Sequence, residues 1–123
     1  DDADGVRITL TAAQLFPAGS AKILPEALKR LDTVGTILKI ADRRLIIEGH
    51  TDNAKISSDL YPSNWELAGA RAATIVRYLI KRHDIPADLV SVASFADQKP
   101  LVSNNSAENR AKNRRIEILI STL

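Results

Sequence analysis

The chain has 123 residues, of which 45% are hydrophobic and 26% charged, with a net charge of +2. This length suits one domain with a hydrophobic core that needs no disulfide or structural metal. The absence of cysteine excludes thiol catalysis and cysteine-based zinc sites, and an aromatic content of 4% argues against a surface that stacks nucleic-acid bases. No segment approaches the ~20 consecutive apolar residues of a membrane span.

The first part of the chain predicts a strand followed by a helix. We expect residues 1–5, an acidic stretch, to be a linker remnant, and residues 6–123 to form one domain. Apolar residues alternate with polar ones from Val6 to Leu10, which predicts a half-buried strand. Residues 15–20 break this strand and turn the chain. Pro25 then suits the first turn of a helix, which carries one apolar stripe formed by Leu24, Leu28, Leu31, Val34 and Leu38.

The second part predicts three more strands and two more helices. Ser63 and Glu66 form a capping box, so a long helix begins there and runs to Ile80. Its apolar side carries Ala68, Ala72, Ile75, Val76 and Leu79. The other expected elements are strands at 45–49, 89–95 and 116–120 and a short helix at 106–112.

These elements predict an α+β fold in the form of a two-layer sandwich. The order is strand, helix, strand, helix, strand, short helix, strand. Each long helix has one apolar stripe, so both helices are expected on the same side of one sheet.

A candidate binding site lies where the second strand ends. If that strand continues, His50 and Asp52 point to the same face. Asn64 and Arg71 are two helical turns apart and share a face. A carboxylate, an amide and a guanidinium would then converge, an arrangement that suits a ligand carrying both an ammonium group and a carboxylate. Asp52 and Arg71 would also pair with each other, so a purely structural salt bridge is the alternative.

Other chemistries fit the sequence less well. Zinc needs three or four ligands, and the only other histidine, His83, lies at a helix end. No nucleophile sits on a recognisable elbow, which argues against a hydrolase. The basic residues between 110 and 115 alternate with polar and acidic residues, as on a solvated surface. We therefore expect no catalysis, no metal, no cofactor and no nucleic-acid partner.

Three segments together resemble the OmpA-like peptidoglycan-binding family, which includes the Pal lipoproteins and the MotB subunit of flagellar stators. They are Gly49-His50-Thr51-Asp52, the run 64–72 (NWELAGARA) and the run 109–118 (NRAKNRRIEI). They occur in the family's order and at compatible spacing. The resemblance implies a βαβαβ-type mixed sheet with helices on one face and a non-catalytic site for the peptidoglycan stem peptide.

The resemblance also implies roles for individual residues. Asp52 and Arg71 would bind the ammonium and carboxylate ends of diaminopimelate, with Thr51 in the same motif as Asp52. Asn64 and Leu67 match the helix start that lines the site. Arg114 and Arg115 match a neighbouring Asn-Arg-Arg segment, and the sequence leaves open which of them faces the ligand. Ala68 stands where many relatives have serine, a difference expected to tune packing only.

The spacing between the first two motifs resembles flagellar stator B subunits more than Pal or OmpA. The run 60–67 (LYPSNWEL) carries this likeness, and type VI secretion proteins of the TssL kind have a similar run. A stator parent implies a periplasmic domain of an inner-membrane protein, a homodimer and a MotA-like partner reached through an upstream membrane helix. An interaction domain whose partner is another envelope protein is the remaining alternative.

Overall fold

A computed structural model describes residues 5–122 of the chain. The strands are β1 (Gly5–Thr11), β2 (Leu45–His50), β3 (Val90–Ala96) and β4 (Arg115–Ser121). The helices are α1 (Ala12–Leu15), α2 (Leu28–Ala41), α3 (Asn64–His83) and α4 (Ala107–Asn113), with 3-10 turns at Pro25–Ala27 and Ala87–Leu89.

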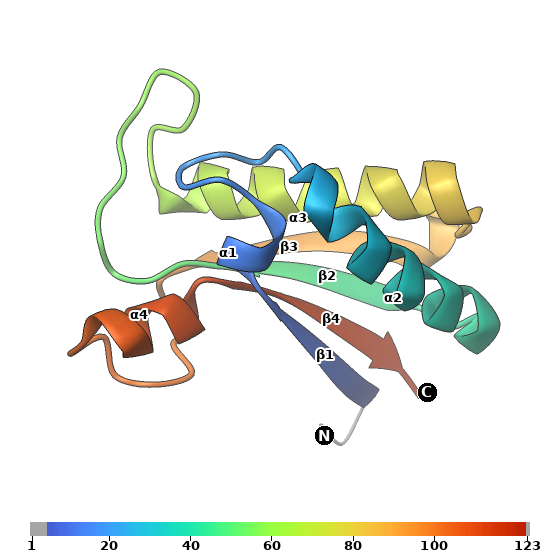
Figure 1. Cartoon of the computed structure of the whole chain (residues 1–123). Helices are drawn as coiled ribbons and strands as arrows, with labels where there is room; N and C mark the ends of the chain where they lie inside the picture. Colours follow the sequence, from blue (N-terminus) through green and yellow to red (C-terminus); the bar gives the residue numbers. More distant parts are fainter. Residues whose placement is uncertain (1–4, 123) are drawn as a thin grey trace.

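The four strands form one mixed sheet in the order β1-β4-β2-β3. β4 runs antiparallel to both of its neighbours, whereas β2 and β3 are parallel. The helices α2 and α3 lie side by side over one face of the sheet, and α4 lies beyond the end at which β2 stops (Figure 1). The predicted two-layer α+β sandwich with helices packed on one face is confirmed.

Strand alternation decides what lies on each face of the sheet. Ile47, Ile116 and Ile118 point toward the helices and are buried. Leu31, Leu38, Ile75 and Leu79 from the predicted helical stripes complete the core with them. The opposite face, which we call the open face, receives every other residue of the same strands.

A glycine sets the distance between α3 and the sheet. A Cβ atom added at Gly49 would lie 2.1 Å from the carbonyl oxygen of Ala68. Only glycine therefore allows the first turns of α3 to lie this close to the end of β2. This contact brings the start of α3 beside the segment that follows β2.

The structure differs from the sequence-based expectations in several places, the first of which is Val6 at the start of the alternating strand, which is 43% exposed. The segment after the first strand contains a short helix, α1, where only a turn was predicted. Leu28 is 38% exposed, because the core-facing position one turn before Leu31 is taken by Ala27, which is 2% exposed. Of the predicted linker remnant, residues 1–4 lie outside the described residues, and Gly5 is already paired with Ser121 in the sheet.

None of the described helices combines the length with the apolar character that crossing a bilayer requires.

Candidate functional site

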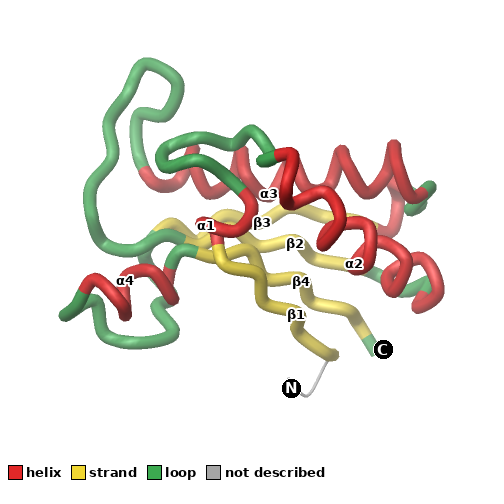
Figure 2. Tube along the Cα trace, in the orientation of Figure 1, coloured by secondary structure: helices red, strands yellow, loops and turns green. Residues whose placement is uncertain are grey.

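A cavity of about 580 Å³ opens where three segments distant in sequence meet. They are α1 with the loop behind it, the loop 51–63 and the first turns of α3, which lie together at one end of the molecule (Figure 2). The cavity is lined by Ala12, Ala13, Phe16, Pro17, Ala18, Gly19, Leu24, Thr51, Asp52, Ala54, Lys55, Ile56, Asn64, Leu67, Arg71 and Arg114. Six of the seven residues predicted for the site line it.

Asp52 presents a buried carboxylate to this cavity. Its side chain is 9% exposed. The oxygen Oδ1 accepts a hydrogen bond from the backbone N–H of Ala54 at 3.1 Å, and Oδ2 accepts one from Nη1 of Arg114 at 2.5 Å. The loop conformation therefore holds the carboxylate in place, and a side chain from β4's N-terminal flank neutralises its charge.

Arg71 presents a guanidinium from α3 to the same cavity, but its partners are backbone carbonyls. Nε donates to Ser20 O at 2.7 Å and Nη2 donates to Pro17 O at 3.2 Å. The guanidinium carbon lies 5.0 Å from the centre of the Phe16 ring. Burial, and to a smaller extent the charge of Arg114, lower the pKa of Arg71 from its usual value. The group stays protonated and is held without an ionic partner among the described residues.

The start of α3 shapes the wall between these two groups. Ser63 caps the helix by accepting from Trp65 N at 3.2 Å, and its hydroxyl donates to the Glu66 carboxylate. The helix start predicted from these two residues is therefore present, but they contact each other through their side chains. Asn64 donates from Nδ2 to Ala54 O at 2.9 Å, which ties the 51–63 loop to the helix. Leu67 adds an apolar surface at 5% exposure. Thr51 donates to the carbonyl of Asp52 at 2.8 Å and steadies the loop backbone.

The Asn-Arg-Arg segment divides between three different surroundings. Arg114 lines the cavity, and its side chain is 40% exposed. Arg115 lies on the open face, where its side chain is 3% exposed and pairs with Glu117. Asn113 is fully buried and holds the 101–104 loop through hydrogen bonds to its backbone. The arginine that faces the cavity is therefore Arg114, and the seventh predicted site residue, Arg115, lies elsewhere.

Two expectations about the site are corrected by this geometry. β2 ends at His50, so His50 points to the open face whereas Asp52 turns toward the cavity. Asp52 and Arg71 were expected to pair with each other. Instead Asp52 pairs with Arg114 and Arg71 donates to two carbonyls, although both side chains line one cavity.

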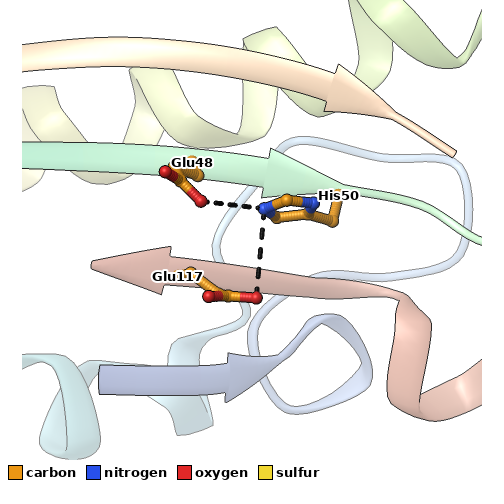
Figure 3. Close-up of side chains that lie close together, drawn as sticks. All are labelled: Glu48, His50 and Glu117. Carbon is orange, nitrogen blue, oxygen red and sulfur yellow. Dashed lines mark hydrogen bonds and ion pairs between the residues drawn. The ribbon is translucent and has the colours of Figure 1, made fainter. Parts of the chain in front are cut away.

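A second polar cluster, which we call the charge network, lies on the open face and consists of Arg7, Glu48, His50, Arg115 and Glu117. Nε2 of His50 lies 3.0 Å from Glu48 and 4.0 Å from Glu117 (Figure 3). Nη1 of Arg7 bridges the two glutamates at 2.9 and 3.0 Å, and Arg115 pairs with Glu117. Phe95 stacks on the His50 ring with centroids 5.2 Å apart.

Glu48, His50 and Glu117 bring three potential metal-ligand atoms within 4.8 Å of one another. Their two negative charges are already balanced by the two guanidiniums of Arg7 and Arg115. A cation bound there would have to displace buried hydrogen bonds that it cannot replace. The arrangement therefore fits a structural network better than a metal centre.

Burial governs the protonation states in the charge network. Burial lowers the pKa of His50, and the hydrogen bond that the His50 ring makes to the Glu48 carboxylate offsets only part of this effect. Burial acts to raise the pKa of Glu117, but the hydrogen bond and charge of Arg115 outweigh it, so the pKa is lowered. The charge network thus favours a neutral imidazole at His50 and an ionised carboxylate at Glu117.

Two of the lining residues that were not predicted from the sequence add specific chemistry to the cavity. The Phe16 ring packs against the guanidinium of Arg71, and Lys55 adds a third cationic side chain to the lining. From the sequence, the segment that contains Phe16 is expected to break the first strand, and it also resembles that of stator B subunits, but neither observation places Phe16 in the cavity. A Phe-Pro dipeptide followed by small residues, in a chain poor in aromatics, was the available signal.

Comparisons with known proteins agree with this fold and site. The family model described as "OmpA family" matches residues 15–114. YtxE of Bacillus subtilis is 38% identical over 119 residues, which cover 97% of this chain and 49% of the relative. Motility protein B of the same organism is 36% identical over 118 residues, covering 95% and 45% respectively. The chain thus spans about half the length of the curated relatives it matches.

Solved structures superpose over almost the whole chain. The cell wall anchor of the type VI secretion system from Pseudomonas aeruginosa gives a TM-score of 0.92 at 32% identity, covering 98% of this chain and 84% of the other. The periplasmic domain of Helicobacter pylori MotB gives 0.89 at 27% identity, covering 99% and 79%. With the family model matched across most of the domain, this chain belongs to the OmpA family.

Proposed function

We propose that this chain is a non-catalytic peptidoglycan-binding domain that anchors a flagellar motor stator to the cell wall. The observation that carries the proposal is the single cavity into which Asp52 and Arg71 both project. The ligand would be the diaminopimelate-containing stem peptide, whose free ammonium and carboxylate groups match the two opposite charges. The relative named Motility protein B and the superposed MotB periplasmic domain support the stator parent.

Each lining residue has a defined part in this recognition. The Asp52 carboxylate accepts hydrogen bonds from the ligand ammonium, and the guanidinium of Arg71 donates to the ligand carboxylate. Backbone carbonyls hold Arg71 in position, so little side-chain entropy is lost when the ligand binds. Thr51, Asn64 and Leu67 shape the wall between the charges, Arg114 adds a second guanidinium, and Arg115 supports strand β4 from the open face.

The lining chemistry favours binding over catalysis. The hydroxyl of Thr51 is engaged with the Asp52 carbonyl. The ring of His50, which a hydrolase would need as a general base near its nucleophile, faces the charge network on the other side of the sheet.

A second candidate is the anchoring domain of a type VI secretion protein of the TssL kind, or of a Pal or OmpA type envelope protein. The TM-score of 0.92 with the type VI secretion cell wall anchor favours it specifically. Both candidates use the same cavity and differ only in the parent machine. The sequence of any segment that precedes this domain in its gene product would separate them, since a membrane span bearing an aspartate is expected only for a stator.

The stator proposal also implies a location and partners. The domain would lie in the periplasm, attached to an inner-membrane helix through which it meets a MotA-like protein, and it would work as a homodimer. Sedimentation of the domain at high concentration tests self-association, and a purely monomeric species would argue against the dimer for this domain.

Sacculus pull-down tests the binding function directly. Asp52→Ala and Arg71→Ala are each expected to weaken binding by about ten- to a hundredfold, because each leaves one ligand charge without its partner. Arg71→Lys keeps the charge but loses the planar fork and should weaken binding too. The matched control is Asp59→Ala, which removes an exposed carboxylate from the same loop outside the cavity.

Circular dichroism on every variant separates lost binding from lost folding. Folded Asp52→Ala and Arg71→Ala variants that bind sacculi as well as the wild type would refute the proposed site. A wild-type domain that does not bind sacculi would favour an interaction domain with a protein partner. Release of soluble fragments from sacculi would reveal a hydrolase.

A further inference from the structure

The side chains that line the cavity carry more positive than negative charge. Its lining holds one carboxylate, Asp52, and three cationic side chains, Lys55, Arg71 and Arg114. Each oxygen of Asp52 accepts one hydrogen bond, and the partner of Oδ2, Arg114, is a cation that already balances the carboxylate charge. Arg71 has only backbone carbonyls as partners. A ligand carboxylate therefore meets a guanidinium without an anionic partner, whereas a ligand ammonium must compete with Arg114 for the charge of Asp52.

The partner that occupies Asp52 is the part of the pair able to move. The Arg114 side chain is 40% exposed, and that of Asp52 is 9% exposed. Asp52 is also tied to the backbone of its own loop through Ala54. When an ammonium group approaches, Arg114 is the group that leaves. Arg114 already lies close enough to Arg71 for its positive charge to lower the pKa of Arg71, so the two guanidiniums repel each other.

From this geometry we propose that Arg114 is a specificity-determining residue that makes the cavity select ligands carrying an ammonium group and a carboxylate together. This inference rests on the proposed function of the same cavity. A ligand with only an ammonium competes with Arg114 for Asp52 and supplies no anion to the two guanidiniums, Arg71 and Arg114. A ligand that also carries a carboxylate supplies that anion, so its two charges bind cooperatively.

Three small molecules with the same carbon spacing test this selectivity. Diaminopimelate carries both kinds of charge, 1,5-diaminopentane lacks the carboxylates, and pimelate lacks the amines. Dissociation constants come from NMR titration of the labelled domain. The wild type is expected to bind diaminopimelate at least ~10-fold more tightly than 1,5-diaminopentane, with pimelate in between because Arg71 is free to bind it.

The decisive variant is Arg114→Gln, which frees Asp52 and keeps a polar side chain. It should lower the dissociation constant of 1,5-diaminopentane by about tenfold. The ratio by which the domain prefers diaminopimelate over 1,5-diaminopentane should decrease by at least as much. The matched control is Lys55→Gln, which removes a positive charge from the same cavity without touching Asp52. Its effect on diamine binding should stay below about threefold, since only the general potential changes.

Two results would overturn the proposal. One is an Arg114→Gln domain that is folded and binds 1,5-diaminopentane no better than the wild type. The other is an equal gain in Lys55→Gln, which would reduce the effect to net charge. A different result would refute the proposed function alone. If the wild-type protein binds neither sacculi nor diaminopimelate while Arg114→Gln still gains affinity for 1,5-diaminopentane, Arg114 controls access of an ammonium group to Asp52, but the cell wall is not the ligand.

Discussion

The cavity and the charge network are built from the same sequence motifs but use their charges in opposite ways. In the charge network, Arg7 and Arg115 balance Glu48 and Glu117, and all four are paired. In the cavity, three cationic groups face one carboxylate, and Arg71 is left with carbonyl partners only. A balanced, buried cluster holds the fold together, whereas an unbalanced and partly open one retains the capacity to bind. Adjacent residues of one motif can therefore have unrelated roles.

Replacing the two neighbouring arginines one at a time tests whether the charge network and the cavity contribute differently to the free energy of unfolding. Arg115→Met leaves Glu117 buried without its main partner and should lower the free energy of unfolding by about 3–5 kcal/mol. Arg114→Met removes a half-exposed partner and should cost less than about 1 kcal/mol. Urea unfolding of both variants measures the difference. Equal losses would show that the two regions are not energetically distinct.

Gly49 lies between the charge network and the cavity. It precedes His50 in β2, and it packs closely against Ala68 in α3. Gly49→Ala should cost about 1–3 kcal/mol, since the new Cβ would press against the Ala68 carbonyl. The displaced helix should also weaken sacculus binding.

Gly69→Ala is the matched control for that substitution. A Cβ there meets only the Cβ of Ser94 at 3.6 Å, an ordinary contact, and alanine favours a helix by up to about 1 kcal/mol. Thermal unfolding should show Gly69→Ala as stable as the wild type or more so. A similar loss in both variants would contradict the close-contact explanation.

The cavity wall depends on the capped start of α3. Ser63→Ala removes the cap on Trp65 N and should lower the free energy of unfolding by about 1 kcal/mol. Urea unfolding measures this loss, and Ser57→Ala, at an exposed position of the same loop, is the control. If the cap holds only the fold and not the cavity, ligand affinity will stay at the wild-type value.

The pH dependence of stability isolates the charge network. The pKa of His50 is lowered in the folded state from its usual 6.5, so the unfolded chain binds the proton more readily. Its contribution to stability is complete above pH 6.5 and is lost as the pH falls toward the folded pKa. Between pH 6.5 and 4.5 the free energy of unfolding should therefore fall less in His50→Gln than in the wild type.

Glu117 adds a separate loss at lower pH. Its pKa is lowered from 4.5, so the stability that it contributes decreases as the pH falls below that value. A His50→Gln profile that matches the wild type between pH 6.5 and 4.5 would show that the imidazole is not neutralised by burial.

Most of the fold follows from local patterns in the sequence. Alternation identified β1, and the capping box with its apolar stripe identified α3 to within a few residues. The helix α1 was missed because its four residues complete barely one turn and show no periodicity. Leu28 was misplaced because helical spacing allows both Ala27 and Leu28 to lie one turn before Leu31. Only the packing against the core shows that Ala27 takes this place.

The candidate site was predictable in its residue types but not in its pairing. The period of two in β4 could have separated the arginines, because Arg115 alternates with Ile116, which faces the helices. The pair between Asp52 and Arg114 joins residues 62 positions apart and depends on how β2 ends, which no local pattern reveals.

The pairing of β1 with β4 has a mechanical consequence. β1 leads from Gly5 to α1, whose first residue lines the cavity, and it is paired with β4 along its seven residues. Tension applied between Gly5 and a molecule held in the cavity would act along β1, which leads directly to α1 in Figure 1. All the backbone bonds between the two strands then share the load in shear instead of opening one after another, a geometry suited to a domain that holds its position under force.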